Sequence, residues 1–515
     1  MRNEKYDVIV VGAGNAAMAA ALSARQAGRS VLVLEAAGPE DLGGNTRYAA
    51  GQMRTTYRGV EDLRRLVPDL TDSEIAQSDF GAYTREDYLD DVMRLTQYRC
   101  DPDLVETLVD NSLDTLLWMR ELGVRFQISY GRQAAKVGGR FKFWGGLPCE
   151  VWGGGAGLLE AYYKAAKSAQ IEIRQRAFVR DLCFTTGRVS GVHCLIEGKP
   201  SSIDGGAVIL ASGGFEASAE MRARYLGQNW DLAKVRGTRF NTGQGLVMAL
   251  AAGASSTGHW SGAHSTCWDL NAPETGDLEV GDGYQKFSYP LGIMVNAHGK
   301  RFVDEGSDLQ TFTYAQIGRE ILAQPGRFAW QIFDQRAVPL LRDEYRIKKI
   351  TKVTADTLEE LAERLEGVNP AGFLETIREF NGAVPPGEPP IDLSKKDGRA
   401  TRGLMVPKSN WTYPIDKGPF HAYGVTTGIT FTFGGLRISP RAEVLDAAWE
   451  PIPGLFAAGE IVGGIFYGGY PGGTGLVSGA VFGRIAGRQA AKLSARREMS
   501  GSGPVDAAAD SAVGN

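Results

Sequence analysis

A short apolar run followed by closely spaced small residues restricts the fold of this chain more than any other feature. Residues 8–11 are Val-Ile-Val-Val, and Gly12, Gly14 and Ala17 follow at the spacing G-x-G-x-x-A. An unbroken apolar run of this length predicts a buried parallel strand. The small residues allow a tight turn and a closely packed helix that begins at Asn15. We therefore expect a Rossmann-like α/β unit at the start of the chain.

A second strand and an acidic residue complete this pattern. Gly28 ends the expected helix, residues 30–34 form an expected second strand, and Glu35 follows it directly. The positive end of the helix would face phosphate groups, and a carboxylate at this point accepts ribose hydroxyls. A glycine motif alone is weak support for a ligand, but the strands, the helix and the acid together predict a dinucleotide site.

The far end of the chain carries a second set of glycine motifs. Residues 454–460 read Gly-Leu-Phe-Ala-Ala-Gly-Glu, and residues 472–476 read Gly-Gly-Thr-Gly-Leu. If both ends meet at one site, the dinucleotide is FAD. The residues expected to bind it are Gly12, Gly14, Asn15, Ala16, Glu35, Gly43, Gly44, Asn45, Thr46, Gly51, Ala211, Ser212, Gly213, Gly459, Glu460, Gly473, Gly475 and Leu476.

Composition excludes several other classes of protein. A net charge of −4 over 515 residues gives no bias toward nucleic acid. The five cysteines are scattered without a C-x-x-C pair, so the sequence supports neither a zinc site nor an iron–sulfur cluster, and we expect no metal. No apolar run reaches about 18 residues, and the first strand leaves no room for a signal peptide. We expect a cytoplasmic protein.

The texture of the sequence changes in the middle of the chain. A hairpin is expected over residues 292–303, and helical patterns follow at 314–323, 358–365 and 370–380, without βαβ alternation. We interpret this part as an inserted α+β capping domain. The expected division is 1–260 and 422–498 for the FAD-binding domain, 261–421 for the cap, and 499–515 for a disordered tail.

Several of these motifs resemble one known family along nearly the whole chain except its tail. Residues 12–14, 43–46, 211–215, 295–305 and 454–460 resemble the fumarate reductase/succinate dehydrogenase flavoproteins. Within that family, the stretches 236–243, 268–274, 302–306, 329–334, 429–435 and 470–476 are most similar to the FAD-dependent tricarballylate dehydrogenases. A related protein type that acts in cobalamin biosynthesis is similar in the same stretches.

The resemblance implies a substrate held between a mobile cap and the flavin. Hydride would pass from a substrate carbon to flavin N5, with a proton leaving the adjacent carbon. Thr46 falls where succinate dehydrogenases have the histidine that binds flavin covalently, so non-covalent FAD is implied. The family also implies an external electron-transfer partner, an iron–sulfur or haem protein, through which the chain could be peripheral to the inner face of the membrane.

The sequence departs from the fumarate reductases at the substrate site. Their arginine proton donor has no counterpart in residues 306–310, and Phe431 and Tyr470 stand about where they have a histidine and an arginine. Efficient fumarate reduction is therefore not expected. The catalytic candidates are His264, Tyr470 and Tyr314, and the candidates for binding a small carboxylate substrate are Arg54, Arg239 and Thr432.

Three functions remain open at this point. The first is dehydrogenation of a C–C bond beside a carboxylate, of the type that converts tricarballylate to cis-aconitate. The second follows from residues 470–472, Tyr-Pro-Gly, which also resemble the 3-ketosteroid dehydrogenases, where a tyrosine polarises a carbonyl; it is desaturation of a cyclic ketone. The third is a flavin electron-transfer subunit in corrinoid biosynthesis.

Overall fold

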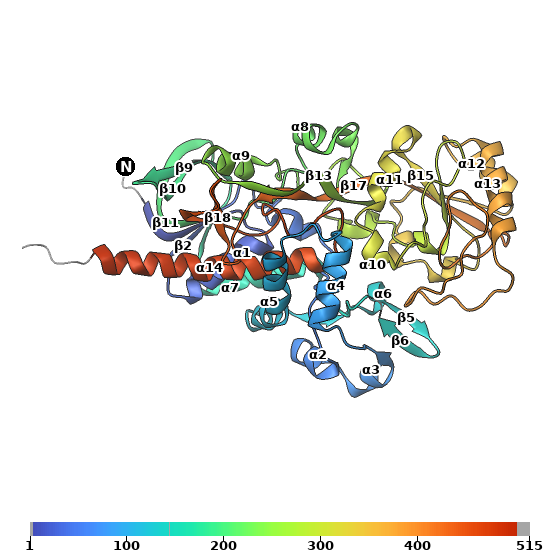
Figure 1. The fold of residues 1–515 in the computed structure, drawn as a ribbon, viewed down its shortest axis with the longest axis horizontal. Coiled ribbons are helices and arrows are strands. Elements are labelled where there is room, and N and C mark those ends of the chain that lie inside the picture. Colours follow the sequence, from blue (N-terminus) through green and yellow to red (C-terminus); the bar gives the residue numbers. More distant parts are fainter. Residues whose placement is uncertain (1–3, 144, 502–515) are drawn as a thin grey trace, which may run out of the picture.

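An eight-stranded sheet forms the core of the first part of the molecule. The computed structural model describes residues 4–143 and 145–501. Strand β1 (Glu4–Val11) lies between β2 (Val31–Leu34) and β11 (Lys199–Leu210) and is parallel to both. Helix α1 (Asn15–Gln26) connects β1 to β2. This arrangement confirms the predicted Rossmann-like start of the chain (Figure 1).

The C-terminal motif joins the same sheet. Strand β19 (Pro451–Ala457) runs parallel to β11, so the segment that follows it lies two strands from the end of β1. The remaining strands of this sheet are β8 (Glu172–Arg174), β9 (Ala177–Thr185), β10 (Arg188–Ile196) and β18 (Glu443–Leu445). Since parallel strands end at the same edge, the two distant glycine motifs meet there.

Helix α14 (Thr474–Gly501) packs closely against α1. It lies along α1 (Figure 1), and a Cβ at Gly483 or Gly487 would collide with the carbonyl oxygen of Ala16 or Ala20. Only glycine permits backbones to approach so closely. The helix continues to Gly501, so the first residues of the segment 499–515, which was expected to be disordered, are helical. The rest of the expected tail, 502–515, lies outside the described residues.

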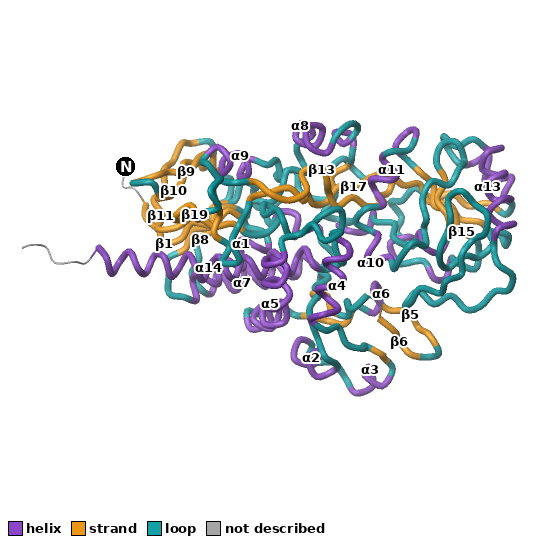
Figure 2. The backbone as a smooth tube through the Cα atoms, viewed as in Figure 1, coloured by secondary structure: helices purple, strands orange, loops and turns teal. Residues whose placement is uncertain are grey.

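A six-stranded sheet extends from the cofactor region into the cap. Its longest members, β13 (Ser256–Asp269) and β17 (Phe420–Leu436), are antiparallel partners and run through the centre of the molecule (Figure 2). The expected domain boundaries at 260–261 and 421–422 fall inside these two strands. The shorter strands are β12 (Lys234–Val235), β14 (Ile293–Val295), β15 (Ala329–Phe333) and β16 (Lys352–Ala355).

Helices cover the far end of this sheet, as expected for an α+β cap. Helices α12 (Leu358–Arg364) and α13 (Pro370–Ala383) share one buried core with β14, β15 and β17. The helix predicted over 314–323 is shorter in the structure, where α11 covers Ile317–Leu322, and a separate short helix, α10 (Gln310–Thr313), precedes it. The predicted hairpin over 292–303 was wrong in its second strand, because only a single bridge joins Val295 to Arg301.

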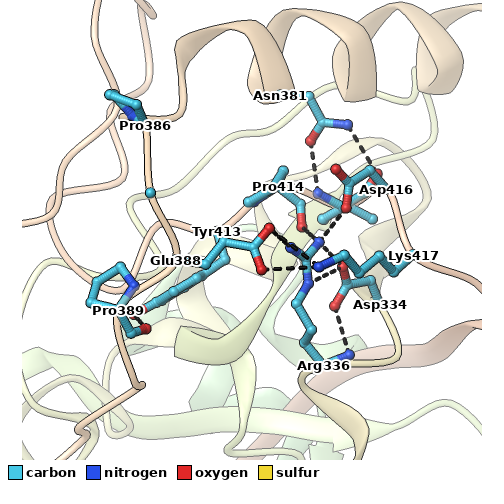
Figure 3. A network of polar contacts seen from close by, with 12 residues as sticks. Asp334, Arg336, Asn381, Pro386, Glu388, Pro389, Tyr413, Pro414, Asp416 and Lys417 are labelled. Carbon is cyan, nitrogen blue, oxygen red and sulfur yellow. Dashed lines mark hydrogen bonds and ion pairs between the residues drawn. The ribbon is translucent and has the colours of Figure 1, made fainter.

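The proline-rich loop after α13, residues 385–390, is attached to the rest of the cap by charged groups. The guanidinium of Arg336 bonds to Asp334 at 2.8 Å and to Glu388 at 2.9 Å, and Lys417 contacts the same Glu388 at 3.0 Å (Figure 3). The hydroxyl of Tyr413 donates to the carbonyl of Pro389 at 2.9 Å. These contacts fix the outer rim of the cap.

Smaller elements complete the cofactor domain. The helices are α2 (Val60–Leu66), α3 (Asp72–Ala76), α4 (Arg85–Leu95), α5 (Pro102–Glu121), α6 (Tyr130–Gln133), α7 (Gly154–Ser168), α8 (Ala219–Met221) and α9 (Gln244–Ala251). The strands are β3 (Ser78–Asp79), β4 (Phe126–Ile128), β5 (Ala134–Val137), β6 (Arg140–Phe143) and β7 (Cys149–Val151). Across residues 4–143 and 145–501, no helix has the length and apolar character needed to cross a bilayer.

Candidate active site

A long cavity begins where β1 ends. Gly12 has φ of +105° and passes so close to the carbonyl of Ala211 that a Cβ would collide with it. The N–H of Ala13 donates to Glu35 Oε2 at 2.8 Å, and the N–H of Ala37 donates to Oε1 of the same residue at 2.8 Å. The acid predicted to face the ribose is therefore held in a fixed position at the cavity wall.

Asn15 connects three segments that are far apart in the sequence. Its backbone N–H donates to Thr46 Oγ1 at 3.0 Å, and its side-chain amide donates to the carbonyl of Leu476 at 2.7 Å. The first glycine motif, the loop that contains Thr46 and the last glycine motif thus close around one space. With the exception of Gly43, which shapes the preceding turn with φ of +115°, every residue predicted to bind the cofactor lines this cavity.

Several buried polar atoms of the cavity wall lack a hydrogen-bond partner in the described chain and indicate what kind of ligand the cavity fits. Asn15 Oδ1, Gln52 Nε2, Ser212 Oγ and Gln285 Nε2 are buried and have no hydrogen-bond partner among the described residues, and all four residues line the cavity. Buried polar atoms are normally satisfied, so this wall suits a ligand rich in donors and acceptors. Together with glycines that leave room for a pyrophosphate, these atoms fit FAD.

The structure brings the three catalytic candidates together at one part of the cavity. His264 lies on β13, Tyr314 lies between α10 and α11, and Tyr470 lies in the segment before α14. The Nδ1 atom of His264 is 2.8 Å from the hydroxyl oxygen of Tyr470. The His264 ring meets the Tyr314 ring edge-on with the centroids 4.8 Å apart. Three polar rings from separate segments therefore face one space.

Burial sets the protonation of these rings. It lowers the pKa of His264 well below its usual value, and the charge of Arg236 lowers it further, so the imidazole is neutral at physiological pH. Burial raises the pKa of Tyr470 well above its usual value, and the neighbouring Tyr314 adds to this. Tyr470 is thus held as a neutral O–H donor.

The pKa of Tyr314 is shifted less strongly. Burial raises it, but the neighbouring Tyr470 hydroxyl and the positive charge of Arg236 act in the opposite direction. Both of these interactions stabilise a phenolate. Of the two phenols, Tyr314 is therefore the one that can more readily give up its proton and take another.

Arg236 is the single Lys or Arg side chain among the described residues that line the cavity. Its Nε donates to Asp282 Oδ1 at 2.9 Å, and its Nη1 donates to Thr430 Oγ1 at 3.2 Å. Arg132 on α6 also pairs with Asp282, at 3.1 Å. The positive charge of Arg236 is therefore already partly offset.

The three predicted substrate-binding residues are not among the side chains that line the cavity. Arg54 is fully buried and donates to the carbonyl of Gly472 at 2.7 Å. Arg239 pairs with Asp41 at 2.8 Å, and its side chain is 64% exposed. Thr432 is bound to Glu460, with its N–H 2.8 Å from Oε1 of that residue. The geometry gives them structural contacts in place of a substrate contact.

Several residues at or behind the cavity wall were not among the predicted site residues: Glu216, Asn241, Asp282, Gln285 and Phe287. Glu216 closely follows Gly213 and Gly214, Asp282 stands between two glycines, and Asn241 lies in the family-like stretch 236–243, so a local signal existed for these three. Gln285 and Phe287 have no pattern around them, because tertiary contacts alone bring them to the cavity.

Comparison with known proteins defines the class of this flavoprotein. A family model for an FAD binding domain matches residues 7–477. A probable fumarate reductase of Shewanella frigidimarina is 31% identical over 476 residues, which cover 90% of this chain and 71% of that protein. The chain belongs to the fumarate reductase/succinate dehydrogenase flavoprotein family. It is an FAD-dependent enzyme that acts on C–C or C=C bonds.

Two further relatives match the chain almost from end to end. A 4-oxocyclohex-2-ene-1-carboxylate 5-dehydrogenase of Sinomonas cyclohexanicum is 28% identical, over 96% of this chain and 95% of that protein. The structure of a 3-ketosteroid-Δ4-(5α)-dehydrogenase of Rhodococcus jostii RHA1 superposes with a TM-score of 0.69 at 25% identity, and the match covers 95% of this chain and 97% of that one.

Proposed function

We propose that this enzyme desaturates the C–C bond next to the carbonyl of a cyclic ketone. The observation that carries the proposal is the group of polar rings formed by Tyr470, Tyr314 and neutral His264. A ketone oxygen needs a hydrogen-bond donor, and the C–H beside it needs a positioned base. The group supplies both without a metal or a second cation.

A tricarboxylate fits this cavity poorly. Each carboxylate removed from water requires a cation or several donors, and the described lining offers one guanidinium that already bonds to Asp282. The lining also contains Phe287 and Phe431, which favour an apolar ring. Arg236 could accept a single substrate carboxylate, so the proposed substrate class is a cyclic ketone with at most one carboxylate.

The proposed roles follow from the contacts. Bound FAD supplies the hydride acceptor at flavin N5. Tyr470 donates its O–H to the ketone oxygen, and His264, in the neutral tautomer with its proton on Nδ1, donates to the Tyr470 oxygen across the 2.8 Å contact and so orients the hydroxyl. Tyr314 takes the proton from the carbon next to the carbonyl. The aromatic wall excludes water, which strengthens each of these interactions.

The relatives support this choice. Two of the relatives that align almost from end to end are named for the dehydrogenation of ring ketones, and the first of these substrates also carries one carboxylate. We further propose that FAD is bound non-covalently, because Thr46 Oγ1 at the predicted attachment position accepts a hydrogen bond from Asn15. Electrons would leave to an external redox partner, as the sequence predicted.

Anaerobic bleaching of the bound flavin tests the proposal. The purified enzyme is mixed in turn with 4-oxocyclohexanecarboxylate, cyclohexanone, a 3-ketosteroid and tricarballylate. We expect bleaching by at least one cyclic ketone and none by tricarballylate. If only tricarballylate bleaches the flavin, the enzyme is a carboxylate dehydrogenase and the proposal is wrong. If none of the compounds bleaches it, the third function, an electron-transfer subunit, is favoured.

A further inference from the structure

Two buried carboxyl groups lie side by side behind the cavity wall. Glu216 follows β11 and Glu460 follows β19, and the two residues are 0% and 8% exposed. The side-chain amide nitrogen of Asn241 donates to Glu216 Oε1 at 2.6 Å and to Glu460 Oε2 at 3.4 Å. One amide group therefore bridges two acids that come from different strands of the sheet.

The other contacts of the pair are neutral. Asn45 Nδ2 donates to Glu216 Oε1 at 2.6 Å, and the N–H of Thr432 donates to Glu460 Oε1 at 2.8 Å. Glu216 Oε2 is buried without a hydrogen-bond donor among the described residues. Across the described chain, no Lys, Arg or His side chain lies within ion-pair distance of either carboxyl group.

Three other charged or titratable side chains face the pair from neighbouring elements. Arg222 acts on Glu216, but its guanidinium is bound by backbone carbonyls, including that of Trp230 at 2.8 Å. Arg236 is occupied by Asp282. Tyr470 lies near enough to Glu460 to interact with it electrostatically and is itself neutral. None of these groups compensates two negative charges.

Two adjacent carboxyl groups without a cation cannot both ionise, so they share one proton. Glu216 Oε1 receives N–H groups from both Asn45 and Asn241, which favours the ionised form at Glu216. Burial and the neighbouring Glu216 raise the pKa of Glu460 well above its usual value. The contacts therefore assign the shared proton to Glu460 and the negative charge to Glu216.

The pair is placed to respond to the cofactor. Asn45, Asn241 and Glu460 all line the cavity into which FAD fits, together with the catalytic candidates. We propose that the Glu216–Glu460 pair binds a second proton when the flavin is reduced. Two electrons enter the flavin, one proton from solvent forms an O–H bond on Glu216, and no bond of the protein breaks.

The physical reason is electrostatic. Reduction places negative charge beside a carboxylate in a region of low dielectric constant, where charges interact much more strongly than in water. Protonation of Glu216 removes that repulsion and makes reduction more favourable at lower pH. The proposal depends on bound FAD and not on the identity of the substrate, so it can fail or hold independently of the proposed ketone chemistry.

Infrared difference spectra of the holoenzyme provide the first test. On reduction with dithionite, the wild-type protein should lose a carboxylate band and gain a protonated carboxyl band that shifts in D2O. Both changes should disappear in Glu216→Gln. The matched control is Glu172→Gln, because Glu172 lies on the same sheet, bonds to Tyr6 and Arg174, and is outside the cavity. This variant should show both spectral changes, as the wild-type protein does.

The midpoint potential of the flavin provides the second test. In the wild-type enzyme the potential should fall with pH by about 30 mV per unit more than in Glu216→Gln, the value for one extra proton per two electrons. Equal slopes in all proteins, or a wild-type infrared spectrum without a carboxyl change, would overturn the proposal. The wild-type infrared spectrum alone shows whether a carboxyl group gains a proton on reduction, so the test holds even if Glu216→Gln loses FAD.

Discussion

His264 Nδ1 lies 2.8 Å from the hydroxyl oxygen of Tyr470, although 206 positions separate the two residues in the chain. The long strand β13 carries His264 from the cofactor side toward the cap, and the segment before α14 carries Tyr470 back from the end of the chain. The catalytic group therefore depends on both sheets being in their final positions.

Removal of the Tyr470 hydroxyl should separate its chemistry from its packing. In Tyr470→Phe the ring can still stack on Phe466, whose centroid is 4.6 Å away, so FAD should be retained. We expect turnover to fall by at least about tenfold, the usual scale for the loss of one transition-state donor. Steady-state rates with an artificial acceptor and the flavin spectrum measure both effects, and an unchanged rate would remove Tyr470 from the mechanism.

Tyr314 should give the reaction a characteristic pH dependence. A base works only when it is deprotonated, and burial raises the pKa of this phenol above its ordinary value. The rate with the wild-type enzyme should therefore rise with pH through the neutral and alkaline range. In Tyr314→Phe we expect a rate at least about a hundredfold lower and no such rise. A rise of equal slope in the variant would assign the proton transfer to another group.

The charge of Arg236 should matter only for substrates that carry a carboxylate. Asp282 would keep its contact with Arg132 at 3.1 Å in Arg236→Gln, so the fold should tolerate the change. We expect KM for 4-oxocyclohexanecarboxylate to rise about tenfold to a hundredfold, the effect of losing a charge-assisted hydrogen bond. KM for cyclohexanone should change much less.

Arg239→Gln is the matched control for that experiment. Arg239 was a predicted substrate clamp, but its side chain is 64% exposed and pairs with Asp41. Surface ion pairs of this kind contribute about 0–1 kcal/mol. Both KM values should stay close to those of the wild-type enzyme, and a selective increase for the carboxylate substrate would return Arg239 to the substrate site.

The contact between α1 and α14 predicts opposite effects for two glycine substitutions. A Cβ at Gly483 would collide with the carbonyl of Ala16, whereas a Cβ at Gly382 on α13 would meet nothing. Gly483→Ala should destabilise the protein by about 1–3 kcal/mol and weaken FAD binding. Gly382→Ala should be neutral or stabilising by up to about 1 kcal/mol. Thermal unfolding with and without added FAD measures both, and equal shifts would contradict this packing.

The cofactor half of the molecule could be predicted because its signals are local. The glycines after β1, the acid after β2 and the motif after β19 each shape the backbone next to them, so their meaning can be read without knowledge of the fold. The long strands β13 and β17 gave no such signal. The second half of β13 and nearly all of β17 are buried on both faces, so their sequences lack regular alternation.

The substrate-binding residues were harder to predict, because their roles depend on tertiary contacts and not on local sequence patterns. Arg54 and Arg239 stand close to family motifs in the sequence, and proximity along the chain suggested a role in binding. The structure directs one guanidinium to the carbonyl of Gly472 and the other to Asp41. Asp282, which decides how much charge Arg236 can offer, lies in a short helical turn over Gly281–Tyr284. Its glycine neighbours mark it in the sequence, but its pairing with Arg236 follows only from the folded structure.

The close packing of α14 against α1 also affects the order in which the FAD site forms during synthesis of the protein. The first strand and helix leave the ribosome before the cap is made, whereas the residues that close their open side, Gly475 and Leu476 among them, follow only after the whole cap. A nascent chain can form the β1–α1–β2 unit and still have no complete pocket for FAD. Incorporation of the vitamin-derived cofactor is therefore a late event in biogenesis, and a ribosome that stops before α14 releases a chain that cannot hold it.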